Sequence, residues 1–265
     1  MNASASLAGQ LPLLMLATAL SVPRVLVFMF IVTLFPSVTY PRMLRVAIAI
    51  GLSAPVAYGV FHTLAVQPQH AGVAALVLKE CVLGLLLATP VAAPFWVLQS
   101  VGALIDNQRG ANASAQLTPF SQADSSVIGS ALQQTLTVVL ASTGVLVGLY
   151  QVLLQSFETW PVLDLAPDLA RFGFDIAVQG FDDWVTKAVL YASPVIAVIL
   201  LVDFAFALIT LFAPQLQAYF ASMPIKSLCA IAVLAVYLSV LMSHADDHYR
   251  DAIRREIAIL KSRSP

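Results

Sequence analysis

Long apolar stretches alternate along this chain with short polar breaks. Six stretches predict membrane-crossing helices, at 11–35, 43–66, 73–105, 127–157, 184–212 and 225–242. Each reaches or exceeds the roughly 18 apolar residues that indicate a bilayer span. Because backbone polar groups in lipid must be satisfied within each segment, the pattern predicts an all-α polytopic membrane protein. The alternation of apolar and polar residues that is typical of transmembrane barrels does not occur in these stretches.

Proline residues inside these stretches predict kinked helices, because proline removes an intrahelical hydrogen bond. Pro23 lies in the middle of the first stretch, and Pro90 and Pro94 interrupt the third. The third stretch is too long for one plain crossing, so we expect a bent helix that leads into the polar segment after it. The expected architecture is a set of kinked helical hairpins.

The longest polar interruption runs from 102 to 126 and separates two apolar stretches. Its glycine, proline and amide residues favour irregular backbone. Apolar residues within it argue against disorder, and long ordered loops are usually functional. Two interpretations remain, namely a solvated connector or a segment that lines or closes a space between helices. The residues that would line or close this space are Ile105, Asp106, Asn107, Gln108, Arg109, Gly110, Leu117 and Phe120.

Composition supports the membrane interpretation. Of the 265 residues, 60% are hydrophobic and 10% are charged, whereas soluble chains average about 25% charged residues. The net charge of −1 gives no electrostatic basis for binding nucleic acid. Cys81 and Cys229 lie in apolar surroundings, which favours small buried side chains over a disulfide. We interpret the chain as one membrane domain, with N-terminal helices in 1–157, an acidic connector in 158–183, a helical hairpin in 184–242 and a charged, helix-patterned tail in 243–265.

Charged residues near the ends of the stretches give conflicting orientations. Arg42 and Arg45 place the first connection in the cytoplasm, and the acidic connector suits the opposite side. Six crossings would then put Lys226 on the cytoplasmic side of the membrane and the tail on the opposite side. The tail nevertheless carries five basic residues, at Arg250, Arg254, Arg255, Lys261 and Arg263. We therefore expect that one stretch does not cross fully, as in hairpins packed into a larger assembly.

Charges inside apolar stretches are costly unless they face protein or water. Arg24 lies in the first stretch, which predicts either a helix packed inside an assembly or two shorter helices. Lys79 and Glu80 are adjacent in the third stretch, and adjacent residues do not face each other on a helix. Asp203, in the fifth, fits either a proton or ion relay or an anchor that pairs with a neighbouring subunit, and its isolation favours the anchor. Lys226 either pairs with Asp203 across the hairpin or extends to the membrane interface.

Catalytic motifs do not appear in the sequence, which contains no nucleophile elbow, P-loop, dinucleotide fingerprint or paired catalytic carboxylates. His244 and His248 are spaced i, i+4 but lack the His-Glu-x-x-His pattern of zinc sites. We therefore expect neither an enzyme nor a cofactor. Two alternatives from other classes are a secondary transporter with a midplane site at broken helices, which no clear internal repeat supports, and an intramembrane enzyme.

Three segments carry a resemblance to a known family. They are VGALIDNQRGA at 101–111, FETWP at 157–161 and DFAFALITLFAPQLQAYFASMPIKS at 203–227. In this order they resemble the SpaR/YscT/HrcT proteins of type III secretion, which are related to flagellar FliR. The resemblance covers nearly the whole chain.

The resemblance implies a structural subunit of an export gate in the bacterial inner membrane, partly raised toward the periplasm. Its partners would be SpaP/YscR-like, SpaQ/YscS-like and YscU-like subunits, secreted polypeptides in transit and membrane lipid. The segment 105–122 would help to plug the channel. The resemblance also implies that Arg24, Asp203 and Lys226 face protein as assembly contacts.

Overall fold

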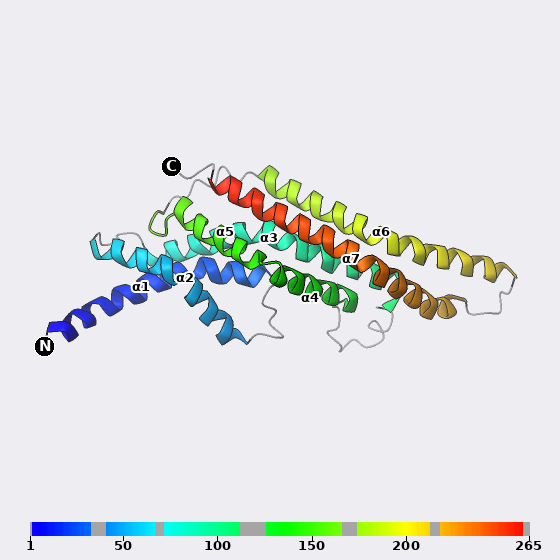
Figure 1. Cartoon of the computed structure of the whole chain (residues 1–265), viewed down its shortest axis with the longest axis horizontal. Helices are drawn as coiled ribbons and strands as arrows, with labels where there is room; N and C mark the ends of the chain where they lie inside the picture. Colours follow the sequence, from blue (N-terminus) through cyan, green and yellow to red (C-terminus); the bar gives the residue numbers. More distant parts are fainter. Residues whose placement is uncertain are drawn as a thin grey trace. The chain divides into compact units, whose positions relative to one another are not determined.

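The computed structural model describes residues 2–32, 41–66, 72–111, 126–165, 174–212 and 218–261. Every regular element in these ranges is a helix, as Figure 1 shows: α1 (Asn2–Ile31), α2 (Arg42–Val66), α3 (Val73–Gln108), α4 (Val127–Ser142), α5 (Val145–Thr159), α6 (Phe174–Phe212) and α7 (Ala218–Lys261). Five helices are long and apolar enough to cross a membrane, or six if α4 and α5 count as one broken span. The prediction of an all-α polytopic membrane protein is confirmed.

The helix predicted over 73–105 is present and continues beyond it into the polar segment, where irregular backbone was predicted. Helix α3 continues to Gln108, and the N–H group of Arg109 still donates to the carbonyl oxygen of Ile105. Gly110 then adopts a positive φ of 79°, a conformation that commonly ends helices and that glycine adopts without a steric penalty. Pro90 and Pro94 lie within the assigned helix, and the kink predicted from them stays a prediction.

The fourth stretch is divided into two helices. Helix α4 ends at Ser142, and Gly144 has a positive φ of 73° at the start of α5. In contrast, the predicted tail is continuous with the sixth stretch, because α7 extends from Ala218 to Lys261. The helical pattern predicted for the tail is therefore confirmed as far as that residue.

The chain forms two compact units. The first contains Met1–Ala92, Gly144–Gly173 and Tyr249–Pro265, and the second contains Ala93–Thr143 and Phe174–His248. In the first unit α1 packs along α2. Its buried apolar side chains come from α1, α2, α3, α5 and the end of α7, and include Leu20, Leu64, Leu83, Val152 and Ile253.

In the second unit, two glycines bring the backbones of α3 and α4 into direct contact. A Cβ atom added to Gly102 would lie 2.1 Å from the amide nitrogen and 2.2 Å from the Cα of Gly129. Conversely, a Cβ on Gly129 would lie 2.7 Å from the carbonyl oxygen of Gln99. Small residues allow such close helix contacts in membrane proteins. This crossing holds the end of α3 against the start of α4.

We predict that Gly102→Ala forces α3 and α4 apart, because the added methyl group meets backbone atoms that cannot move independently. Overpacking of this kind costs about 1–3 kcal/mol. The measurement is the thermal unfolding of the purified protein in detergent. Gly51→Ala in α2 is the matched control, because a Cβ there meets nothing within 4 Å. An unfolding temperature of Gly102→Ala equal to that of the control would contradict the close contact.

Candidate functional site

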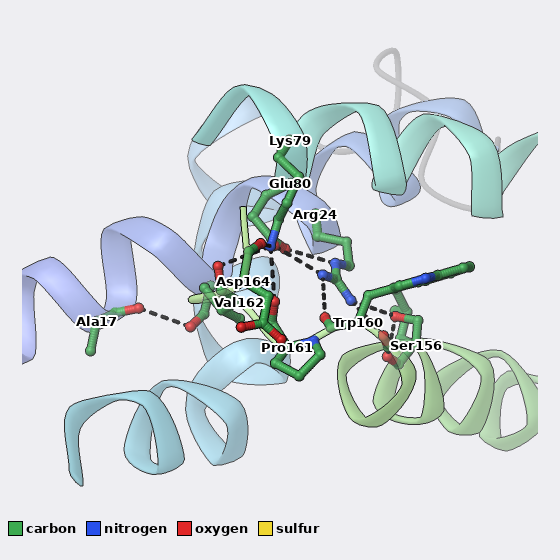
Figure 2. Close-up of polar contacts among 11 residues, drawn as sticks. Ala17, Arg24, Lys79, Glu80, Ser156, Trp160, Pro161, Val162 and Asp164 are labelled. Atoms are coloured by element: carbon green, nitrogen blue, oxygen red, sulfur yellow. Dashed lines mark hydrogen bonds and ion pairs between the residues drawn. The ribbon is translucent and has the colours of Figure 1, made fainter. Parts of the chain in front are cut away.

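The most completely buried charged groups among the described residues are Arg24 on α1 and Glu80 on α3. Both side chains are 0% exposed. The Arg24 Nε donates to Glu80 Oε2 at 2.7 Å, and its Nη2 donates to Oε1 at 2.9 Å. Two parallel hydrogen bonds between a guanidinium and a carboxylate form the strongest geometry for such a pair. Figure 2 shows the two side chains meeting between their helices.

The same guanidinium also binds the end of α5. Its Nη1 donates to the carbonyl oxygen of Ser156 at 2.8 Å and to the Ser156 Oγ at 3.1 Å. Its Nη2 donates to the carbonyl oxygen of Trp160 at 2.9 Å. Cations suit helix C-termini, where the last carbonyl groups lack partners within the helix. With the two bonds to Glu80, all five N–H donors of the guanidinium are used.

Lys79 extends this cluster to the backbone that follows α5. Its Nζ donates at 2.9 Å to the carbonyl oxygens of three residues, Pro161, Val162 and Asp164. The same nitrogen lies 2.8 Å from Glu80 Oε1. The expectation that the adjacent Lys79 and Glu80 do not meet is therefore wrong. Their long side chains turn toward one set of partners, and Figure 2 shows them converging.

Close packing of α1 and α3 surrounds this ion cluster, which consists of Arg24, Lys79 and Glu80. A Cβ on Gly84, one turn beyond Glu80, would lie 2.6 Å from the carbonyl oxygen of Arg24. The Arg24 Cζ lies 4.0 Å from the centre of the Phe157 ring. Because these groups already contact one another in a dry interior, the cluster is suited to holding helices together rather than to binding a solute.

A second polar site lies where α3 ends and α4 begins. Asp106 is 1% exposed, and its Oδ2 accepts hydrogen bonds from the Ser126 Oγ at 2.5 Å and from the Ile128 N–H at 3.1 Å. Its Oδ1 accepts from Arg109 Nε at 2.8 Å. The Ser126 Oγ in turn accepts from the Gly129 N–H and caps α4. A carboxylate at a helix N-terminus is favoured by the helix dipole.

The other residues predicted for the central segment have different positions. Ile105 is fully buried, whereas Asn107 and Gln108 are exposed at the end of α3. A Cβ on Gly110 would lie 3.4 Å from the Met223 Cε. Leu117 and Phe120 lie outside the described residues. The structure therefore brings Asp106 and Arg109 together with the start of α4.

The sequence left open whether Asp203 is a relay or an anchor, and the structure pairs it with Lys226. Their side chains form an ion pair between α6 and α7 and are 38% and 9% exposed, respectively. The pairing across the hairpin that the sequence allowed is thus present. No group of His, Cys, Asp and Glu among the described residues is arranged to hold a metal ion. His248 instead contacts the Lys187 Nζ.

Sequence reasoning missed the most important pairings. Arg24 is buried by partners in its own chain, and neither Glu80 nor the carbonyl groups after α5 were predicted as those partners. Two opposite charges in two apolar stretches were a usable signal, because charges within membrane helices commonly pair with each other. The binding of the α4 N-terminus by Asp106 had no comparable signal.

We predict that Glu80→Gln strongly destabilises the protein, because it leaves the buried Arg24 charge without a counter-ion. Breaking one partner of a buried pair costs about 3–5 kcal/mol. The measurement is thermal unfolding in detergent. Asp183→Asn is the control, because the Asp183–Lys187 pair has side chains 55% and 22% exposed and exposed pairs contribute at most about 1 kcal/mol. Equal effects of the two substitutions would show that the cluster does not stabilise the fold.

We also predict that a charge swap preserves the α6–α7 ion pair. Asp203→Lys alone places two cations together and should lower stability by about 1 kcal/mol, since the pair is partly exposed. Adding Lys226→Asp should recover most of the loss, as measured by thermal unfolding of both variants. If the double variant is no more stable than Asp203→Lys, the pair is not a stabilising contact.

The chain matches known proteins over most of its length. The sequence model of the bacterial export proteins, family 1, matches residues 15–252. The Yop proteins translocation protein T of Yersinia pestis is 36% identical over 170 residues, which are 64% of this chain and 65% of that protein. The surface presentation of antigens protein SpaR of Salmonella typhimurium is 33% identical over 191 residues, 71% of each chain. SpaR of Shigella flexneri is 31% identical over 166 residues, 63% of each chain.

These matches confirm the resemblance noted in the sequence. The three segments that carry the resemblance, 101–111, 157–161 and 203–227, all lie within the matched range. The long apolar helices agree with a location in the membrane. The chain is therefore a multi-pass inner-membrane protein that belongs to the bacterial export proteins, family 1.

Proposed function

We propose that the chain is a structural, non-enzymatic subunit of the inner-membrane export gate of a type III protein secretion system. The family supports this role, as do relatives named for the translocation of Yop proteins and for the surface presentation of antigens. The ion cluster agrees with it, because the donors of Arg24 are used to join helices. The partners in the gate are SpaP/YscR-like, SpaQ/YscS-like and YscU-like subunits, and secreted polypeptides pass through it.

The finer part of the proposal is that the segment 105–122 helps to plug the channel. The observation that carries it is the binding of the α4 N-terminus by Asp106, twenty positions before Ser126 in the sequence. This contact holds the end of α3 against the start of α4, the two helices that the segment connects. A connecting segment can open by local unfolding while the helices at its base stay joined. A plug that yields to a passing polypeptide needs this combination.

We expect that deleting residues 111–116 leaves the assembly intact but makes the membrane leaky to ions or small solutes. The deletion preserves Asp106, Ser126 and their hydrogen bond, so the helix ends stay joined while the segment becomes too short to fill the channel. The measurement is dye or ion leakage in cells that produce the complete complex, with assembly checked by co-purification of the other subunits.

Asp106→Ala tests the base of the segment separately. It leaves the Ile128 N–H and Arg109 without their acceptor, which lowers the stability of this contact by about 1–3 kcal/mol. Like the deletion, it should make the membrane leaky. Asp182→Ala, at an exposed carboxylate on α6, is the matched control. If the shortened protein assembles, shows no leak and supports normal secretion, the segment is only a connector and the plug proposal is wrong.

A further inference from the structure

The start of α2 contains a buried cation without an acceptor. Arg45 is only 7% exposed, and its Nε is enclosed without a hydrogen-bond partner. None of the ion pairs among the described residues involves Arg45. Arg24 is also buried and also lies over an aromatic ring, but each of its N–H donors has an acceptor. A buried guanidinium is costly unless it is paired, so Arg45 points to an anion from outside the described chain.

The guanidinium lies between the end of α1 and the start of α2. Its Cζ is 4.5 Å from the centre of the ring of Phe30, next to the last residue of α1. The face of the ring attracts the positive charge. The N–H groups lie in the plane of the guanidinium, however, and the ring offers them no hydrogen-bond acceptor there. Long side chains on a helix extend toward its N-terminus. Arg45 therefore reaches back toward the first turn of α2, where Arg42 is exposed.

The first turn of α2 favours an anion for a second reason. It contains no acidic residue. The N–H groups of Leu44 and Arg45 donate to the Pro41 carbonyl, so an anion would be held by the arginine side chains and the helix dipole rather than by these two amides. The positive end of the helix dipole thus adds to the charges of Arg42 and Arg45. Helix N-termini with nearby arginines bind phosphate groups in many proteins, because guanidinium groups match phosphate oxygens in pairs.

One side of α2, beginning next to this site, is apolar and exposed. Helix α2 is a candidate membrane span from its first residue, Arg42, onward. Along one side it exposes Met43, Ile50 and Tyr58, which are 87%, 46% and 65% exposed. Basic residues at the head of a span lie at the level of the lipid headgroups. A phospholipid combines a phosphate at this level with acyl chains beneath it, whereas a free phosphate or a peptide carboxylate provides only the anion.

We propose that Arg42 and Arg45, at the N-terminus of α2, bind the phosphate of an anionic phospholipid whose acyl chains lie along the exposed side of α2. The site shares no residue with the ion cluster. The inference does not depend on the export role, because it rests on the burial of Arg45, the helix terminus and the exposed apolar side.

The test measures phosphatidylglycerol bound to the full-length protein in detergent, together with any subunits that co-purify, by native mass spectrometry across a lipid titration. Arg45→Gln should retain roughly tenfold less lipid, because charge-assisted hydrogen bonds are lost. Arg42→Gln should weaken retention in the same direction, and its exposed position keeps folding unaffected. Arg254→Gln removes the same charge at an exposed position in the tail and should bind like the wild type.

Thermal unfolding provides the second readout. Phosphatidylglycerol should raise the unfolding temperature of the wild type but not that of Arg45→Gln, whereas inorganic phosphate at the same concentration should have little effect on either. Equal retention of phosphatidylglycerol by the wild type, Arg45→Gln and Arg42→Gln would overturn the inference. Equal protection by inorganic phosphate would overturn the assignment to lipid. Loss of a co-purifying subunit from Arg45→Gln with lipid retained would identify a protein carboxylate as the counter-ion and also overturn it.

Discussion

The buried ion pair between Arg24 and Glu80 is the contact on which the first unit depends. Neither side chain is exposed, and taking an ion out of water costs several kcal/mol unless it is paired. Both carboxylate oxygens and the carbonyl groups at the end of α5 are needed to satisfy one guanidinium. The helices α1, α3 and α5 must therefore meet in one register, because a shift of α3 by one turn would leave both charges unpaired.

Other features of the first unit follow from this contact. Gly84 has no side chain because α3 approaches the backbone of α1 one turn after Glu80. Lys79 holds the chain that leaves α5, since its ammonium group binds the carbonyl groups of Pro161, Val162 and Asp164 there. The donors of Arg24 are all used within the chain, so the cluster has no free guanidinium donor for a ligand. Arg45, in the same unit, has no acceptor for its Nε, unlike the donors of Arg24.

In the second unit, a polar cap and glycines join α3 to α4, and a partly exposed ion pair joins α6 to α7. Asp106 binds the N-terminus of α4, and Gly102 lets α4 approach α3. Both contacts lie beside the segment that separates the two helices.

The sequence alone determined the helices, the membrane location and the family. Apolar periodicity and length are local properties, so they predicted most spans, and the segments at 101–111 and 203–227 identified the family. Helix ends were predicted less well. Residues 106–108 look like the start of a loop because they are polar, yet they are helical, and Asp106 finds a partner in Ser126.

Only the tertiary structure decided which charges are paired. Arg24 and Glu80 are 56 positions apart, and Asp106 and Ser126 are 20 positions apart. No local pattern links such residues, because the pairing depends on which helices pack together and in what register. The same holds for Asp203, which is isolated in its apolar stretch of the sequence but pairs with Lys226 on the neighbouring helix. Arg42 and Arg45 looked alike as a basic turn, and burial alone separated an exposed arginine from an enclosed one.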